Sequence, residues 1–230
     1  ILSNEGMKIF QTIKTLFTLL FLILFSLGNV KAQEFEKQIQ DLIANQVKNP
    51  EGPGGVFMVA KDGELKFLKA VGMANLELKV PMSPDQVFQI GSMTKQFTAV
   101  GVLLLHQEGL LDVKDPISNY VSDFPNGDQI TIHHLLSHTS GIRDFTKMKS
   151  LNAIANKKMT PKEMVDFFKN EPVDFSPGEK FEYNNSNYVL LGYLIELVSG
   201  KPYAEFLQTR IFDPIGMANS YFATDRLLIP

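Results

Sequence analysis

Apolar positions in the first third of the chain follow two different periods. Phe35 to Gln46 has the spacing of an amphipathic helix. Val56 to Ala60 and Leu65 to Val71 are apolar runs of strand length, separated by Lys61-Asp62-Gly63-Glu64. An Asp-Gly pair between two such runs favours a tight turn. This part of the chain therefore predicts a helix followed by an antiparallel hairpin.

The remainder of the chain has mainly helical spacing. A helix is predicted from Ser92 to a stop at Gly109, and its apolar residues occupy nearly every side, which places it in the middle of a domain. Two further helices are predicted over Pro161 to Lys169, opened by Thr160, and over Tyr188 to Val198. Strands followed by a helical block indicate an α+β fold.

The segment before the predicted domain has the composition of a secretory signal. Residues 7 to 32 begin with Met7-Lys8, continue through a nearly unbroken apolar run from Leu16 to Leu27, and end in Val30-Lys31-Ala32 before Gln33. The apolar run is shorter than the ~20 residues that span a bilayer. We therefore expect a cleaved signal peptide and a periplasmic or secreted protein. The alternative is an uncleaved membrane anchor, the one case in which membrane contact is expected. Residues 1 to 6 precede the Met and are of uncertain, upstream origin.

Composition narrows the possible partners. A net charge of −3 and a pI of about 5.8 give no electrostatic reason to expect nucleic acid. The chain has no Cys, which excludes disulfides and a lipid-modified Cys. His133, His134 and His138 cluster, but they lack the Glu-bearing pattern of a metalloprotease helix. We expect no metal and no cofactor, and read His138 to Gly141 as the exit from a helix into a loop.

The first candidate for chemistry is Ser92-Met93-Thr94-Lys95. An amine three residues after a hydroxyl lies on the same helix face, one turn away, within reach of its proton. At a helix start, unpaired N–H groups also favour a developing oxyanion. The alternative is a Ser at a helix N-terminus with an unrelated surface Lys, since a Ser-x-x-Lys pattern is common by chance.

The second candidate is Tyr183-Asn184-Asn185, which follows a Pro177-Gly178 turn and is expected to lie on a loop. A phenol beside an ammonium has a lowered pKa and acts as a general base, while an amide orients a substrate carbonyl and the Lys. The alternative is a half-buried Tyr between turn Asn residues. The segment Arg143 to Thr146 is expected to line the substrate cleft, and Ser140 invites a Ser-His hydrolase reading, although no Gly-x-Ser-x-Gly elbow surrounds it.

With these motifs in order, the chain resembles the serine β-lactamase-like superfamily, in particular the branch of class C β-lactamases, D-alanyl-D-alanine carboxypeptidases and related esterases. The resemblance covers about residues 35 to 222. Tyr-x-Asn in place of Ser-Asp-Asn favours class C over class A. The matching stretches are Phe88 to Lys95, Ile132 to Ile142, Phe175 to Gly178, Tyr183 to Tyr188, and Ile211 to Met217.

The resemblance implies a β-lactamase-like or DD-peptidase fold, in which an antiparallel sheet accompanies a helical block. It implies Ser92 as the nucleophile, Lys95 and Tyr183 as the proton-transfer pair, and Asn185 as a substrate-orienting amide. Which of Lys95 and Tyr183 is the base stays open. The implied activity is that of an exported serine hydrolase that acylates Ser92 with a D-Ala-D-Ala peptide, a β-lactam or a small ester or amide.

The chain departs from the family pattern in one respect. The family has a third motif, Lys-Thr-Gly or His-x-Gly, and the sequence after Asn185 contains neither. The Lys in Gly200-Lys201-Pro202 reads as a helix stop. We therefore expect residues 35–230 to be an incomplete domain whose C-terminal strands are missing. The alternative function is a penicillin-binding or sensing module without turnover, or an inactive truncated fragment.

Overall fold

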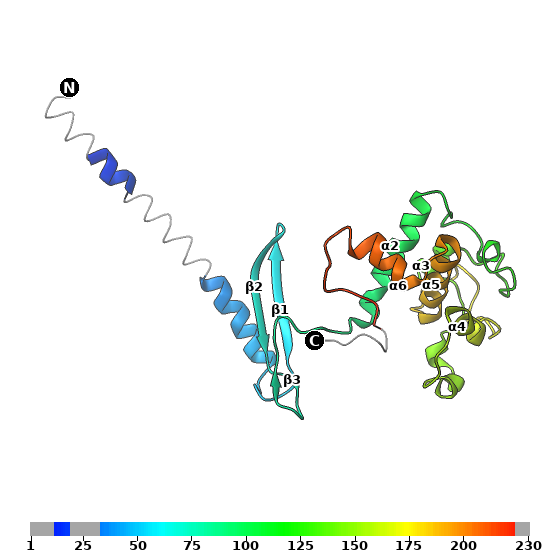
Figure 1. The fold of residues 1–230 in the computed structure, drawn as a ribbon, viewed down its shortest axis with the longest axis horizontal. Helices are drawn as coiled ribbons and strands as arrows, with labels where there is room; N and C mark the ends of the chain where they lie inside the picture. Colours follow the sequence, from blue (N-terminus) through cyan, green and yellow to red (C-terminus); the bar gives the residue numbers. More distant parts are fainter. Residues whose placement is uncertain (1–11, 19–32, 224–230) are drawn as a thin grey trace, which may run out of the picture. The chain divides into compact units, whose positions relative to one another are not determined.

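The computed structural model describes residues 12–18 and 33–223, drawn as coloured ribbon in Figure 1. The chain divides into two compact units, residues 1–88 and residues 89–230. Residues 12–18 are helical, whereas the rest of the predicted leader, residues 7–11 and 19–32, lies outside the described residues. Over the described ranges, no helix combines the length and the apolarity that crossing a bilayer requires.

The first unit contains the predicted helix and hairpin. Residues 33–46 are helical, and strands β1 (Gly55–Lys61) and β2 (Glu64–Val71) pair antiparallel. The turn between them places Asp62 at φ 54° and Gly63 at φ 76°. Two successive positive φ values belong to the turn whose twist matches that of the strands, which is why Asp-Gly favours it. The prediction of the hairpin is confirmed.

A second small sheet follows the hairpin. Strand β3 (Met73–Asn75) pairs antiparallel with β4 (Val80–Pro81). Strands of two or three residues carry too few positions for an alternating apolar pattern, so the sequence did not reveal them. The described residues thus hold two separate two-stranded antiparallel sheets.

The second unit is a block of helices built around α5 (Asn185–Ser199), which contacts four other helices and appears in orange among them in Figure 1. Those helices are α2 (Thr94–Gln107), α3 (Ile132–Leu136), α4 (Pro161–Phe168) and α6 (Tyr203–Leu207). Shorter helical turns are η1 (Gly91–Met93), η2 (Ile117–Asn119), η3 (Phe145–Lys147), η4 (Lys149–Ala153) and the π-helical η5 (Gln208–Phe212).

The core of this unit is formed by α5 and the apolar faces turned toward it. Leu190, Leu191, Leu194 and Ile195 of α5 are fully buried. Because successive buried positions on α5 point in several directions, the helix packs against neighbours on more than one side. The largest side chains buried with them are Val102, Leu105, Ile117, Ile130, Ile132, Leu135, Phe168 and Phe206.

Helix α2 differs from the prediction in its burial. Val102 and Leu105 are buried, but Val100 is 43% exposed and Leu103 is 49% exposed. The helix was predicted to be covered on nearly every side. In this structure one stripe of it, which includes Val100 and Leu103, stays exposed, while Phe97 and Leu104 pack partly buried against the core. The composition of α2 fixed its apolarity, whereas the neighbouring elements decide which face is buried.

Capping side chains set the starts of the two helices that the sequence placed approximately. Thr160 caps α4 as expected, with Pro161 at the first helical position. Glu163, which the sequence analysis did not single out, completes a reciprocal capping box with Thr160. Helix α5 begins at Asn185, three residues before the predicted start at Tyr188, because the Asn184 side chain accepts a hydrogen bond from the Asn187 N–H at 3.0 Å.

Candidate active site

Ser92 and Lys95 meet at the start of α2. Ser92 lies in the 3₁₀ turn η1, immediately before the α-helix begins at Thr94. Lys95 Nζ donates a hydrogen bond to Ser92 Oγ at 3.2 Å. The spacing of three residues therefore brings the amine to the hydroxyl, as the sequence predicted. Ser92 is an exposed residue.

Tyr183 reaches the same hydroxyl from a segment about ninety residues later in the chain. Its OH donates a hydrogen bond to Ser92 Oγ at 2.6 Å, and the residue is 42% exposed. The Lys95 side chain, and next the Ser92 hydroxyl, lower the pKa of Tyr183 below its ordinary value of 10.0, against a smaller opposing effect of burial. At a given pH, Tyr183 therefore has a larger phenolate fraction than a free tyrosine.

Asn185 completes the contacts of Lys95. Its Oδ1 accepts a hydrogen bond from Lys95 Nζ at 3.0 Å. The sequence analysis expected the whole Tyr183-Asn184-Asn185 motif on a loop. For Asn185 this was wrong, because Asn185 is the first residue of α5, and only the other two residues of the motif lie before the helix. A site built on a helix holds its side chains more precisely than a site built on a loop.

The ammonium of Lys95 also lies near two aromatic rings. Its Nζ is 4.8 Å from the ring centre of Tyr183 and 5.7 Å from that of Tyr188. Tyr188 is held by a hydrogen bond from its OH to the Leu136 carbonyl at 3.1 Å. Burial raises the pKa of Tyr188 and the nearby Tyr183 adds to this, so Tyr188 stays a neutral phenol. Two hydrogen-bond acceptors and two ring faces suit a positively charged amine.

His138 contacts the Tyr183-Asn184 segment through a hydrogen bond and through its ring. Its Nδ1 accepts the backbone N–H of Asn184 at 3.1 Å, and its ring centre is 4.8 Å from that of Tyr183 and 5.0 Å from that of Tyr188. Burial, followed by the charge of Lys95, lowers the pKa of His138, so the ring is neutral and keeps its acceptor nitrogen. Within the described ranges no group of His, Asp or Glu side chains is arranged to hold a metal ion.

The segment expected to line the cleft contributes two side chains that the motifs did not identify. Asp144 Oδ2 accepts a hydrogen bond from Asn185 Nδ2 at 3.2 Å, and Thr146 Oγ1 lies 3.4 Å from the same nitrogen. Ser186 also ties this segment to α5, since its Oγ accepts the Phe145 N–H at 2.9 Å. The available sequence signal was position alone, because a lone Asp in a loop carries no motif.

Ser140 is not arranged as a nucleophile. It is 1% exposed, and its Oγ donates to Asn187 Oδ1 at 2.7 Å while accepting the Ile142 N–H at 3.2 Å. The next residue, Gly141, has φ 74°, and a Cβ at that position would lie 1.9 Å from the Phe175 carbonyl oxygen. Only glycine fits there. Ser140 and Gly141 therefore build the turn that follows α3, as the reading of residues 138–141 as a helix exit predicted.

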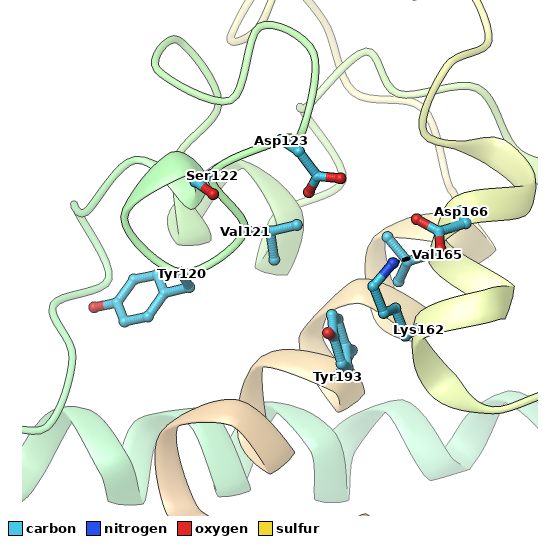
Figure 2. Close-up of a pocket in the computed structure, with 8 residues that line it drawn as sticks. All are labelled: Tyr120, Val121, Ser122, Asp123, Lys162, Val165, Asp166 and Tyr193. Carbon is cyan, nitrogen blue, oxygen red and sulfur yellow. Dashed lines mark hydrogen bonds and ion pairs between the residues drawn. The ribbon is translucent and has the colours of Figure 1, made fainter.

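A separate pocket of about 110 Å³ lies between α4, α5 and the loop after η2. Figure 2 shows Lys162 and Asp166 of α4 and Tyr193 of α5 around it. Its charges are paired: Lys162 with Asp166 at 2.6 Å, and Lys169 with both Asp166 and Asp123. No residue of the Ser92 site lines this pocket; the lining residues are Tyr120, Val121, Ser122, Asp123, Lys162, Val165, Asp166 and Tyr193.

Comparison with known proteins identifies the family of this chain. Residues 39–228 match the family described as Beta-lactamase. The chain is 35% identical to penicillin-binding protein 4* of Bacillus subtilis (strain 168) over 175 residues, which are 75% of this chain and 39% of that protein. It is 33% identical over 195 residues to the putative penicillin-binding protein PbpX of the same organism, covering 83% of this chain and 48% of the relative.

Solved structures give the same result. A D-amino acid amidase from Ochrobactrum anthropi SV3 superposes with a TM-score of 0.75 and 34% identity, over 85% of this chain and 54% of the amidase. The octameric penicillin-binding protein homologue from Pyrococcus abyssi superposes with a TM-score of 0.72 and 34% identity, over 82% and 45% of the two chains. The chain thus spans about half the length of these relatives. The family match, the identities and the superpositions agree, and the chain belongs to the Beta-lactamase family, with the β-lactamase and DD-peptidase fold of its solved relatives.

Proposed function

We propose that the protein carrying this chain is a serine hydrolase that forms an acyl-enzyme on Ser92. The observation that carries the proposal is the convergence of two proton-bearing groups on one hydroxyl, Lys95 Nζ at 3.2 Å and Tyr183 OH at 2.6 Å from Ser92 Oγ. A serine alcohol is a weak nucleophile until a neighbouring base removes its proton. Within the part of the chain that the structure describes, no other serine has both neighbours.

In this proposal Tyr183 is the base, and Lys95 Nζ keeps the hydrogen bond that it donates to Ser92 Oγ. The lowered pKa of Tyr183 increases the phenolate fraction, and the phenolate accepts the Ser92 proton along the 2.6 Å contact. Ser92 Oγ then forms a bond to the carbonyl carbon of the acyl donor. When the bond to the leaving group breaks, the Tyr183 phenol returns the proton to it. A water molecule then attacks the acyl carbon while the Tyr183 phenolate accepts its proton. The bond between the acyl carbon and Ser92 Oγ breaks, the carboxylic acid leaves, and the Tyr183 phenol returns the proton to Ser92 Oγ.

The acyl donor that we propose is a small carboxylic derivative: a D-Ala-D-Ala peptide, a β-lactam, or a small ester or amide such as a D-amino acid amide. Support comes from similarity to a D-amino acid amidase and to penicillin-binding proteins. Asn185 is assigned to orient the substrate carbonyl and Lys95. Neither step needs a cofactor.

Covalent labelling tests the assignment. In the protein expressed from its complete gene, one molecule of a fluorophosphonate or of a fluorescent penicillin should attach covalently to Ser92. The attachment is measured as an increase in intact mass, and Ser92→Ala should abolish it. Ser140→Ala is the matched control, because it removes a hydroxyl that is buried in the turn after α3. Labelling that survives in Ser92→Ala would refute the assignment.

A second function is favoured by the relatives named as penicillin-binding proteins: acylation without turnover. Measuring turnover of a chromogenic β-lactam and of a p-nitrophenyl ester beside intact mass separates the two. A stable adduct without product accumulation indicates a binding or sensing module. We further propose that residues 7–32 export the protein to the periplasm or the medium.

A further inference from the structure

Asp144 is a buried carboxylate with a complete set of donors. It is 3% exposed and lies at the N-terminal end of η3. Its Oδ1 accepts from the Thr146 N–H at 3.0 Å and from the Thr146 hydroxyl at 2.8 Å. Its Oδ2 accepts from the Asn185 side-chain amide at 3.2 Å and from the Asn185 N–H at 3.3 Å. Among the described residues, all four of its hydrogen-bond partners are donors, and both carboxylate oxygens accept.

The carboxylate decides which way the Asn185 amide points. An Asn side chain carries an acceptor and a donor end, and rotation by half a turn exchanges them. With Nδ2 donating to Asp144, Oδ1 faces Lys95 Nζ at 3.0 Å. The exchanged orientation would place an oxygen against a carboxylate and an N–H against an ammonium, so both contacts would become repulsive.

The consequence extends to the nucleophile. Lys95 Nζ is hydrogen-bonded to both Asn185 Oδ1 and Ser92 Oγ, at 3.0 and 3.2 Å. Loss of the first contact leaves the long Lys side chain without the acceptor that holds it over Ser92. We propose that Asp144 is a positioning residue for acylation: it touches neither the substrate nor Ser92, and acts by fixing the Asn185 amide, which in turn fixes Lys95. This role rests on the proposed function of Ser92.

Asp144→Asn tests the proposal with a nearly isosteric change. The two Thr146 donors hold Oδ1 of the new amide, so its Nδ2 meets Asn185 Nδ2, donor against donor, and the Asn185 amide turns over. Misplacement of a catalytic group by about 1 Å costs on the order of 100-fold in rate. We therefore expect the second-order rate of Ser92 labelling to fall on the order of 100-fold. Asp123→Asn is the matched control, since Asp123 pairs with Lys169 at the separate pocket, and its labelling rate should equal that of the parent.

A double-mutant cycle separates positioning from general loss of structure. In an Asn185→Ala background, Asp144→Asn should change the labelling rate by no more than about two-fold, the usual scatter of additivity. A purely structural residue would slow both backgrounds by the same factor. Equal slowing in both, or labelling of Asp144→Asn at the parent rate, would overturn the proposal.

A swapped pair covers the case in which Asp144→Asn alone does not fold. In the double variant Asp144→Asn with Asn185→Asp, the amide introduced at position 144 donates to the carboxylate introduced at position 185. That carboxylate also faces Lys95. This pair should label faster than Asn185→Asp alone, in which two carboxylates confront each other; a slower rate would contradict the proposed contact.

An NMR measurement makes the inference independent of catalysis. The Asn185 side-chain NH₂ signal, assigned by its absence in Asn185→Ala, should show slow proton exchange in the parent and fast exchange in Asp144→Asn. If the parent fails to label at all, the proposed function fails, and the exchange measurement still decides whether Asp144 holds the amide. Equal exchange in both proteins would refute that contact.

Discussion

Replacing Tyr183 by Phe removes one oxygen from the site and leaves the ring in place. The ring keeps its tilted contact with the His138 ring, with centres 4.8 Å apart, and its position beside Lys95 Nζ. Because the residue is 42% exposed, loss of its hydroxyl leaves little buried polar surface unsatisfied. The folded structure should therefore change little, and the effect should fall on the reaction.

The size of that effect follows from the contact that is lost. Tyr183 OH is the closest hydrogen-bonding partner of Ser92 Oγ, at 2.6 Å against 3.2 Å for Lys95 Nζ. A positioned general base contributes about 10²- to 10⁴-fold. This corresponds to about 3 to 5 kcal/mol in the activation free energy. We expect the acylation rate of Tyr183→Phe to fall by that factor.

The pH dependence of the acylation rate should reflect the lowered pKa of Tyr183. The base acts as the phenolate, so the acylation rate rises with pH as Tyr183 loses its proton. Since the Lys95 side chain and the Ser92 hydroxyl lower the pKa of Tyr183 below 10.0, the rise should be centred below pH 10. In Tyr183→Phe this limb should disappear. Because Tyr183 and Lys95 are coupled, the limb reports the pair, and removal of both should cost far less than the product of the single losses.

The assay is the pH profile of Ser92 labelling, followed by intact mass, in the parent, Tyr183→Phe, Lys95→Met and the double variant. Thermal unfolding of each variant provides the control for folding. A near-normal rate with an unchanged pH profile in Tyr183→Phe would refute the reasoning and leave Tyr183 as a structural residue. Strict multiplication of the two single losses would refute the coupling.

Two further predictions concern the turn after α3 and the leader. Ser140→Ala leaves Asn187 Oδ1 and the Ile142 N–H without their buried partner, so the free energy of unfolding should fall by about 1 to 3 kcal/mol. Urea titration measures this change, and Ser92 labelling should be kept. Unchanged stability would contradict these two hydrogen bonds. For the leader, N-terminal sequencing of protein exported by a Gram-negative host should read from Gln33, whereas Met7 retained in a membrane fraction would favour an anchor.

The sequence was sufficient for features decided within a few neighbouring residues. The Asp62-Gly63 turn follows from the positive φ angles that this pair tolerates, and the start of α4 follows from Thr160 as its cap. The proximity of Ser92 and Lys95 also follows from helical spacing alone. Each of these is a local consequence of backbone geometry, independent of what the rest of the chain does.

Features that join distant segments were decided by the tertiary structure. The sequence named Tyr183 and Asn185 through the order of motifs, yet only the packing of α5 against α2 brings them to Lys95 and Ser92. Asp144 carries no motif, because its role depends on an amide in another element and on burial. Burial of one face of α2 likewise depends on its neighbours. Hydrogen bonds between side chains far apart in sequence are set by how helices pack, and no local pattern of residue types records that arrangement.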